Sequence, residues 1–585
     1  MNSYPLPSGL FLILLSFLPF TTACDKSETR VDQLKMNFVT NIDNTPLISW
    51  QTESEHEGFI QSAFQILISD GEDKLKKDEG NIWDSGKTLS SEQMNIKAGG
   101  EFKSGNQYFI RVRVWDADDS PSSWSETRGF FIPLEYPENW HSQWISYDYH
   151  PDSALPVFTK VFKKSPEKLI DFVRLYIAAP GFYEAFLNGE KIGNNVLDPG
   201  QTNYEDYTFY TAYEIDKDWL KEENTLSVML GNGWYNQNVV WKGQEEYSVM
   251  VYGQPVFTGQ LIIRYENGEE EIIGSDETWK WKNGPITYSN IYGGETYDAN
   301  LEVDMVSGNY ESDPSWKNAL PAVIHPVELY EQYADPIRKM GTVEVRRIID
   351  NGDGKYIFDM GENYAGWLKL SIDGEKGQEI TIRFAEELDA EMNLDPATTG
   401  VRATTVVQTS KYICKGEGTE VWEPRFTYHG FRYAEVSGLK EKPAKELLEG
   451  VRVYSSVPDA GQFSSSEENL NKLHELATRT IISNIHSIPT DCPHRERCGW
   501  TGDAHALVQS LFFNYDAQRF MIKYMFDMRS SAREEKVELY FGKDFHDRSM
   551  VTKPEGIPTM IVPGKRTSGI ASPDWGTAMV QLPWY

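Results

Sequence analysis

The feature that most limits the fold of this chain is a change of hydrophobic periodicity near residue 455. Before it, from about residue 31, short runs alternate apolar and polar residues between clusters of Gly, Asn, Asp and Pro. The runs 63–70 (AFQILISD) and 108–116 (YFIRVRVWD) are clear examples, and the run 259–274 contains Asn267-Gly268, a typical hairpin turn. Helical spacing is almost absent here, so the pattern predicts a series of β-sandwiches.

Proline-rich segments divide this strand-rich part. Residues 132–140 (IPLEYPENW), 320–326 (LPAVIHP) and 454–470 (YSSVPDAGQFSSSEENL) mark three breaks. They predict a leader over 1–23, β-sandwiches over 24–135, 136–325 and 326–455, and a helical domain over 456–585.

After the third break the spacing becomes helical. Ser465 and Glu468 form the pattern of a capping box at the start of a first helix. Its apolar stripe is expected to contain Leu470, Leu473, Ala477, Ile481 and Ile485. A second helical stretch is predicted within 503–528, with a break near Asn514. Two or three helices do not bury their own apolar stripes, so we expect these to need partners.

Composition excludes some functions. The formal net charge of −32 argues against nucleic-acid binding and against anionic membrane surfaces, because no basic stripe exists to neutralise phosphates. The chain has 17 Trp, 31 Tyr and 28 Phe, and aromatic faces stack on sugar rings. The cores of β-sandwiches also favour aromatic residues, so the count alone does not decide between these interpretations.

The N-terminus has the pattern of an export signal. Residues 10–20 (LFLILLSFLPF) form an apolar core that is too short to span a bilayer, and small residues follow up to Cys24. This end resembles a bacterial lipobox, in which the cysteine is lipidated and becomes the mature N-terminus. We therefore expect an exported periplasmic or cell-surface lipoprotein of a Gram-negative bacterium, with Cys24 as its anchor.

Three further cysteines, Cys414, Cys492 and Cys498, do not make a disulfide framework in a chain of this length. Cys492 and Cys498 flank His494, but this spacing matches no common zinc-ligand set. The sequence predicts buried free thiols and no metal site.

The segment 489–506 (PTDCPHRERCGWTGDAHA) concentrates polar groups around one tryptophan. Pro493 disfavours helix in the residues before it, so 490–493 are expected to form a loop after the first helix. Asp503 is expected to cap the next helix. A carboxyl among like charges or against an aromatic ring can hold a proton near neutrality, as a general acid must. Such a loop favours glycoside hydrolysis, although a structural salt-bridge network would use the same residues.

The stretch 491–504 (DCPHRERCGWTGDA) resembles the signature of the bacterial α-L-rhamnosidases of glycoside hydrolase family 78, close to D-C-P-x-R-E-R-x-G-W-x-G-D-A. It matches every fixed position. The resemblance continues through much of the chain, including 59–70 in a fibronectin-type module, 181–204 in the next sandwich and 358–370 in the sandwich before the barrel. The segment 572–585 (SPDWGTAMVQLPWY) is similar to a later barrel segment.

The resemblance implies inverting hydrolysis of terminal α-L-rhamnosyl residues of plant or microbial glycans in an (α/α)6 barrel, with no required cofactor. It implies that Glu496 is the general acid that protonates the leaving oxygen. The residues implied to contact the sugar are Asp491, Arg495, Trp500, Asp503 and Trp575.

Inversion also needs a second carboxylate that activates water. In the resembled family that base is a Glu in the later part of the barrel, beyond Tyr585. Glu534, Glu535 and Glu538 lie in no context similar to the base motif. We therefore expect that the chain lacks the base and is inactive, or nearly so, by itself.

One alternative is a carbohydrate-binding protein that uses only its β-sandwiches. Some members of the family bind rhamnose on such a domain with Ca²⁺, and Asn188, Asn203 and Asn232 lie in loops that could serve. Another alternative is a different inverting glycosidase on the same barrel, which the DCPHRER context disfavours. Replacing Glu496 by Gln separates catalysis from sandwich-borne binding.

Overall fold

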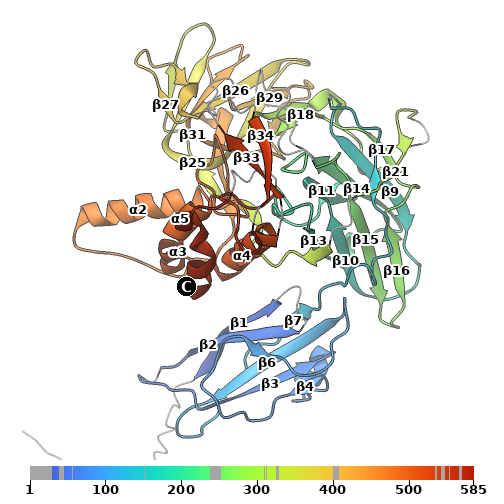
Figure 1. Cartoon of the computed structure of the whole chain (residues 1–585). Helices are drawn as coiled ribbons and strands as arrows, with labels where there is room; N and C mark the ends of the chain where they lie inside the picture. The colour runs from blue at the N-terminus through green and yellow to red at the C-terminus, as the bar shows by residue number, and fades with distance from the viewer. Residues whose placement is uncertain are drawn as a thin grey trace, which may run out of the picture. The chain divides into compact units, whose positions relative to one another are not determined.

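The computed structural model describes residues 29–38, 45–55, 57–151, 153–236, 252–308, 310, 313–324, 328–399, 407–533, 536–541, 547–552, 554–564 and 570–585. The chain forms two compact units, Met1–Ile132 and Pro133–Tyr585 (Figure 1). The predicted leader 1–23 and Cys24 lie outside the described residues. Among the described helices, none has the length and apolarity needed to cross a bilayer.

The first unit is a β-sandwich of a three-stranded sheet, ordered β1-β2-β5, and a four-stranded sheet, ordered β4-β3-β6-β7. The elements are β1 (Arg30–Phe38), β2 (Pro46–Glu53), β3 (Ala63–Ser69), α1 (Glu72–Leu75), β4 (Trp83–Asp84), β5 (Ile96–Lys97), β6 (Gln107–Trp115) and β7 (Arg128–Phe131). Both strands predicted from alternating patterns are present as β3 and β6. Their apolar side chains, among them Ile66 and Ile110, pack with Trp50 from the facing sheet.

The second unit begins with another sandwich, built from a five-stranded sheet (β16-β15-β10-β13-β22) and a six-stranded sheet (β12-β11-β14-β9-β17-β20). Its strands are β9 (Pro156–Lys163), β10 (Ile170–Ala178), β11 (Phe182–Leu187), β12 (Glu190–Lys191), β13 (Tyr207–Ile215), β14 (Glu223–Gly231), β15 (Thr258–Tyr265), β16 (Glu270–Gly274), β17 (Lys280–Asn283), β20 (Lys317–Asn318) and β22 (Glu328–Glu331), with β8 (Ile145–Ser146) paired to β21 (Leu320–Pro321). The hairpin predicted at Asn267-Gly268 joins β15 to β16, and Gly268 has the positive φ of +84° that such a turn requires.

A ten-stranded sheet follows. Its strands are β18 (Ile286–Asn290), β19 (Gly294–Asp298), β23 (Ile337–Val343), β24 (Arg347–Asp350), β25 (Tyr356–Asp373), β26 (Glu379–Ala385), β29 (Thr409–Ile413), β30 (Thr419–Trp422), β31 (His429–Ser437) and β32 (Leu448–Ser455), beside the short pair β27 (Glu387–Leu388) and β28 (Leu394–Asp395). Strands β18 and β19 precede β20 in the chain but belong to this later sheet. They do so because β19 pairs in parallel with β29.

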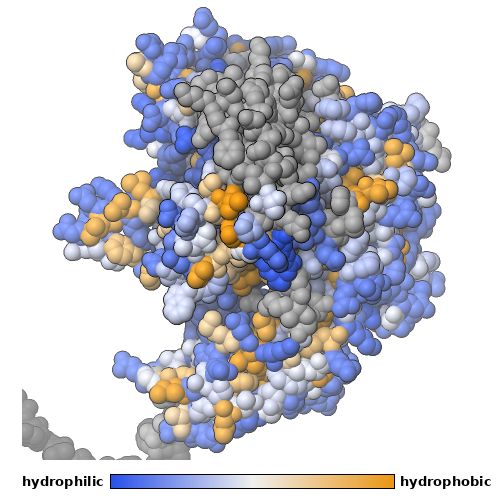
Figure 2. All heavy atoms as spheres, in the orientation of Figure 1, coloured by the Kyte–Doolittle hydropathy of each residue, from blue (hydrophilic) through white to orange (hydrophobic). Residues whose placement is uncertain are grey.

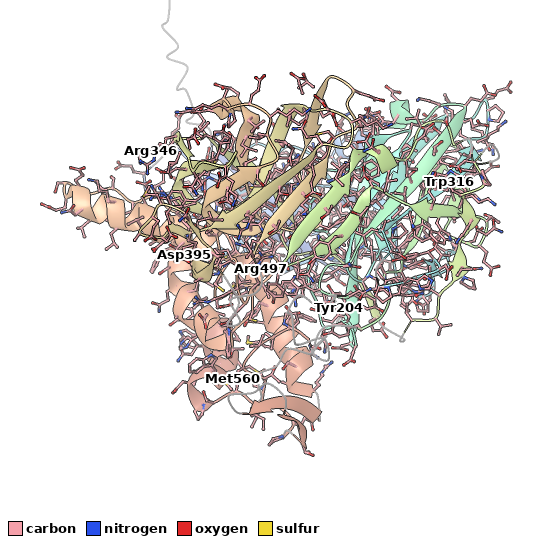
Figure 3. All side chains as sticks on the ribbon, turned by 90° about the horizontal axis from the view of Figure 1, so that it is seen from above. Tyr204, Trp316, Arg346, Asp395, Arg497 and Met560 are labelled. Atoms are coloured by element: carbon pink, nitrogen blue, oxygen red, sulfur yellow. The ribbon has the colours of Figure 1, made fainter. Side chains whose placement is uncertain are left out.

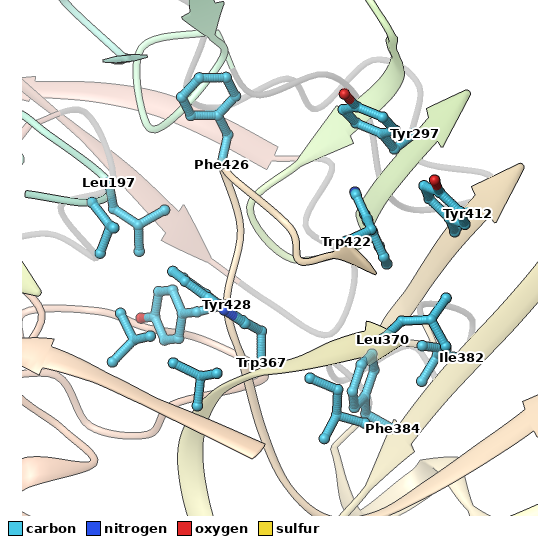
Figure 4. Close-up of a cluster of buried hydrophobic side chains, with 14 of the residues drawn as sticks. Leu197, Tyr297, Trp367, Leu370, Ile382, Phe384, Tyr412, Trp422, Phe426 and Tyr428 are labelled. Carbon is cyan, nitrogen blue, oxygen red and sulfur yellow. The ribbon is translucent and has the colours of Figure 1, made fainter. Parts of the chain in front are cut away.

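The two sandwiches of the second unit share one core. Leu197 of the earlier sandwich belongs to the same buried cluster as Trp367, Phe426 and Tyr428 of the later one (Figure 4). Removing this much apolar surface from water is the main force that holds the two sandwiches together.

Helices follow β32. They are α2 (Glu468–Ile482), α3 (Thr501–Asn514), α4 (Gln518–Arg533), α5 (Pro573–Gly576) and α6 (Ala578–Gln581), with the hairpin β33 (Lys536–Phe541) and β34 (Asp547–Thr552) between α4 and α5. Single 3-10 turns are η1 (Lys217–Trp219), η2 (Ala299–Leu301), η3 (Pro396–Thr398), η4 (Lys445–Leu447) and η5 (Leu582–Trp584). The predicted break near Asn514 is confirmed, because α3 ends at that residue.

The predicted capping box at α2 is wrong. The helix begins at Glu468, so this residue is its first rather than its third, and its carboxylate does not return to the N-cap amide. Instead the Ser465 hydroxyl accepts a hydrogen bond from the Glu467 amide at 3.0 Å.

Helix α2 projects from the rest of the second unit, and apolar side chains lie on its surface (Figures 1 and 2). Leu470 and Leu473, predicted for the buried stripe, are 49% and 62% exposed, whereas Ile481 and Ile485 are buried. As expected, the described helices do not bury the whole stripe by themselves.

Candidate active site

The loop between α2 and α3 contains most of the candidate residues. The prediction that 490–493 are not helical is confirmed, and the loop passes directly into α3 at Thr501. The Thr501 amide donates to the Met560 carbonyl at 2.9 Å, and Trp500 forms an isolated β-bridge with Ile561. The start of α3 is therefore fixed by a distant segment rather than by a local cap.

Asp503 is not the cap of α3, contrary to the prediction. The N-cap is Trp500, which has no capping side chain, and Asp503 lies in the first turn. A carboxylate there still interacts favourably with the positive end of the helix. Loss of surrounding water raises the pKa of Asp503, its own backbone N–H opposes that shift, and the nearby Glu496 carboxylate adds to it.

Glu496 is held at both its side chain and its main chain. The Trp500 indole Nε1 donates to Glu496 Oε2 at 3.1 Å. The Glu496 amide donates to Cys492 Sγ at 3.3 Å, and its carbonyl accepts from the Tyr292 hydroxyl at 2.5 Å and from Cys498 Sγ at 3.2 Å. One contact thus orients the carboxyl group, and three hold the main chain that carries it.

Asp491 lies beside Glu496. Its amide donates to the Cys498 carbonyl at 3.0 Å, and its Oδ1 accepts from the Cys498 amide at 2.9 Å. Side-chain donor atoms of Asp491, Glu496 and Cys498 lie within 4.8 Å of one another. The loop therefore brings two of the three predicted carboxylates together.

Two carboxylates and a thiol are donors that a divalent cation can use. Here, however, Asp491 Oδ1 and Cys498 Sγ already take part in hydrogen bonds within the loop. As predicted, the thiols of Cys414, Cys492 and Cys498 are buried and form no disulfide, and burial raises the pKa of Cys492 to about 11. The absence of a metal requirement remains a prediction.

Arg495 is exposed, and its amide donates to His494 Nδ1 at 2.7 Å. That bond makes Nδ1 the acceptor, so Nε2 carries the proton and faces Glu386 Oε1 at 3.3 Å. Burial works against the charge of Glu386, but His494, the hydrogen bond from Asn363 and the Arg495 guanidinium together outweigh it and lower the pKa of that carboxyl. No local sequence signal could have placed Glu386, which follows β26, beside this loop.

The two candidate tryptophans both lie at the start of α3, Trp500 as its N-cap and Trp575 against Gly502. The indole N–H of Trp500 is directed at Glu496, as described above. Trp575, in α5, packs against Gly502: a Cβ added to Gly502 would lie 2.7 Å from its ring. Trp575 Nε1 is buried and forms no hydrogen bond with the described residues.

Gly502→Ala is expected to lower the free energy of unfolding by about 1–3 kcal/mol, because the new methyl group overlaps the Trp575 ring. With Trp575 replaced by Ala, the same change should be neutral or stabilise by up to about 1 kcal/mol, since Ala is the better helix former. Urea unfolding of the four proteins measures both values. Gly576→Ala is the control, since its Cβ would meet Ala571 at an ordinary 3.7 Å. If Gly502→Ala lowers the free energy of unfolding equally with Trp575 in place and in the Trp575→Ala variant, the Gly502–Trp575 contact is not the cause.

The asparagines named for Ca²⁺ have other roles in the structure. Asn188 donates to the Trp219 carbonyl and accepts from the Thr225 amide, and Asn203 donates to Ser530 Oγ. Asn232 donates to the Ser289 carbonyl. A Ca²⁺ site on a sandwich remains a prediction. Among the base candidates considered, Glu534 and Glu535 lie outside the described residues, and Glu538 lies in β33.

The loop places two carboxyl groups side by side, and an indole N–H orients one of them. Glycoside hydrolases use carboxyl groups held in this way to protonate the leaving oxygen. Family models agree in detail. They match an α-L-rhamnosidase N-terminal domain (168–341), a bacterial α-L-rhamnosidase concanavalin-like domain (349–454) and a bacterial α-L-rhamnosidase six-hairpin glycosidase domain (458–585). A Rha78A-like N-terminal immunoglobulin domain matches 27–134.

Individual proteins give the same result. An α-L-rhamnosidase of Formosa agariphila is 37% identical, with 98% of this chain and 63% of that protein covered. The structure of α-L-rhamnosidase from Dictyoglumus thermophilum has a TM-score of 0.83 at 35% identity, covering 95% of this chain and 61% of that one. The chain belongs to the bacterial α-L-rhamnosidases of glycoside hydrolase family 78.

A Streptomyces avermitilis α-L-rhamnosidase complexed with L-rhamnose shares the fold, with a TM-score of 0.82 at 23% identity over 95% of this chain and 68% of that one. The predicted fold class, β-sandwiches followed by the helical six-hairpin layer, is confirmed. The comparisons do not support the non-catalytic sugar-binding alternative. This chain spans about three fifths of the length of the Formosa and Dictyoglumus proteins.

Proposed function

We propose that this chain binds a terminal α-L-rhamnosyl residue of a glycan at the loop 489–503 and that Glu496 protonates the leaving oxygen during inverting hydrolysis. The observation that carries the proposal is the position of Glu496. Trp500 and Tyr292 hold this residue by hydrogen bonds, and the carboxyl group of Asp491 lies beside its own. A general acid needs this restricted geometry to deliver its proton at the right atom.

The side chains divide the work as follows. Glu496 Oε2 accepts from the indole, so the transferable proton belongs on the other carboxyl oxygen. Asp491 and Asp503 accept hydrogen bonds from sugar hydroxyls, and Arg495 donates to them. Trp500 and Trp575 supply apolar surface for the sugar ring and its methyl group. As Glu496 protonates the leaving oxygen, the glycosidic C–O bond breaks through an oxocarbenium-like transition state, which the neighbouring carboxylates stabilise.

The water-activating base stays unassigned. It should lie roughly 6.5–9.5 Å from the acid across the sugar. The proposal includes export with lipidation at Cys24, which the apolar run before that residue supports. It requires no cofactor.

The test uses azide, an anionic nucleophile that needs no base. With azide, the chain should convert phenyl α-L-rhamnoside to the β-azide, and Glu496→Gln should slow this by about 10²–10⁴-fold. ¹H NMR identifies the product anomer. Calorimetry should show that L-rhamnose binds both proteins, and more tightly than L-mannose, whose extra hydroxyl would meet the apolar surface.

Glu468→Gln is the control, because this exposed carboxylate on α2 pairs with Lys472 and with no other cation among the described residues. It should leave both readouts unchanged. Absence of L-rhamnose binding, or azide turnover that is indifferent to Glu496→Gln, would refute the proposal.

A further inference from the structure

Arg497, the residue after Glu496, is buried at the junction of the helices and the β-sandwiches (Figure 3). It is 1% exposed, and among the described residues it forms no ion pair with a carboxylate. Its Nε donates to the Pro493 carbonyl at 3.0 Å, its Nη2 to Gln408 Oε1 at 3.1 Å and its Nη1 to the Ile291 carbonyl. The guanidinium thus joins the loop to the segments before β19 and β29.

Aromatic rings complete the surroundings of this guanidinium. Its central carbon lies 4.1 Å from the ring centre of Tyr428 and 5.5 Å from that of Tyr292. Tyr428 is in turn stacked on His486, with ring centres 4.0 Å apart. Burial lowers the pKa of Arg497, and the aromatic faces partly compensate for the lost water.

Only arginine fits this position. Three acceptors in fixed directions match the planar fork of a guanidinium, and the flat ion lies over aromatic rings, whereas a lysine ammonium is a single point charge. The backbone of Arg497 has φ of +51°, a conformation that costs a non-glycine residue energy and persists where the surroundings enforce it. Burying a charge in a strained residue next to the acid is hard to explain by stability alone.

The same β-sandwich segment also contacts Glu496 directly. Tyr292 lies between β18 and β19 and donates to the Glu496 carbonyl. Its neighbour Ile291 accepts from Arg497. Two consecutive residues of the acid loop, Glu496 through its carbonyl and Arg497 through its guanidinium, are therefore held from one turn of the sheet.

We infer that Arg497 and Tyr292 are positioning residues that fix the carboxyl of Glu496 from the β-sandwich side. The β-sandwiches are then working parts of the active site, not only supports for it. That Arg497 and Tyr292 position a general acid rests on the proposed function. Their structural coupling to Glu496 does not.

The first test measures, without any reaction, whether changes at Arg497 and Tyr292 move the carboxyl group of Glu496. The Trp500 indole N–H donates to Glu496, so its ¹⁵N–¹H resonance, assigned from its loss in Trp500→Phe, reports the carboxyl position. Tyr292→Phe and Arg497→Lys should move this resonance toward its position in Glu496→Gln. Arg425→Lys is the matched control: Arg425 is a partly buried arginine that joins the same sandwiches by pairing with Glu184 of β11. It should leave the resonance in place.

The second test measures proton transfer to the leaving group, with azide as the nucleophile. Arg497→Lys should lower the rate by about 10²-fold for phenyl α-L-rhamnoside, whose leaving group needs the proton. The rate for the 2,4-dinitrophenyl substrate, whose leaving group does not, should change little. Tyr292→Phe should show the same selectivity to a smaller extent, which tests the inference if Arg497→Lys does not fold.

An unchanged Trp500 resonance in both folded variants would overturn the inference. Equal rate losses for both substrates would also overturn it, because they indicate general loosening. If the parent chain has no turnover but the resonance moves as expected, the coupling holds and the proposed function fails.

Discussion

Replacing Asp527 by Asn should lower the free energy of unfolding by about 3–5 kcal/mol, because it removes the partner of a buried charge. Lys523 and Asp527 lie one turn apart on α4 with their side chains fully buried, and Nζ is 2.7 Å from Oδ2. Burial lowers the pKa of Lys523 and raises that of Asp527, so each depends on the other for its charge. Lys523 also donates to the Gln201 carbonyl, which joins α4 to the preceding sandwich. Urea unfolding measures the loss.

Lys523→Met in addition to Asp527→Asn should recover most of this stability, since no unpaired charge remains. Asn keeps an oxygen for the Tyr207 hydroxyl, which donates to Asp527 Oδ1 at 2.7 Å. Glu468→Gln breaks the exposed pair with Lys472, also four residues apart, and should cost under about 0.5 kcal/mol. A double variant as unstable as Asp527→Asn alone would show that the buried charge is not the cause.

The second large effect concerns pH. Burial raises the pKa of Glu295 to about 7, although backbone N–H groups of Phe426 and Arg425 and the charge of Arg425 favour the ionised form. Glu184, on the same Arg425, opposes ionisation. The folded state therefore holds this proton more tightly than the unfolded chain does.

Stability from Glu295 is fully present below its ordinary pKa of 4.5 and is lost as pH rises through about 7. The difference corresponds to about 3 kcal/mol. Glu295→Gln keeps an acceptor oxygen but does not titrate. The free energy of unfolding of the wild type, minus that of the variant, should therefore fall by this amount between pH 4.5 and 8. Urea unfolding across that range measures it.

Glu269→Gln serves as the control, because this exposed carboxylate is hydrogen-bonded to Lys168 and should show only a small pH-dependent difference. If the difference for Glu295→Gln does not vary with pH, Glu295 does not titrate near neutrality in the folded protein.

Much of the fold could be predicted from local patterns. Alternation at 63–70 and 108–116, the turn at Asn267-Gly268 and the break at Asn514 depend on periodicity and turn chemistry, which act within a few residues. The loop at 490–493 followed from the backbone restriction of Pro493. Local patterns were less reliable at helix ends. Ser465 bonds to Glu467 and Asn471 instead of forming the predicted box, and the start of α3 is fixed by the distant Met560 rather than by Asp503.

For the candidate site, the sequence determined which chemical groups are present: Asp491, Glu496 and Trp500 lie in one loop whose spacing brings them together. The tertiary structure decided how that loop is held. Tyr292, Gln408 and Glu386 reach it from strands and turns that lie about 90 to 200 residues earlier in the chain. Contacts across such separations follow from sheet topology and shared core packing, not from local spacing, so no periodic signal marks them.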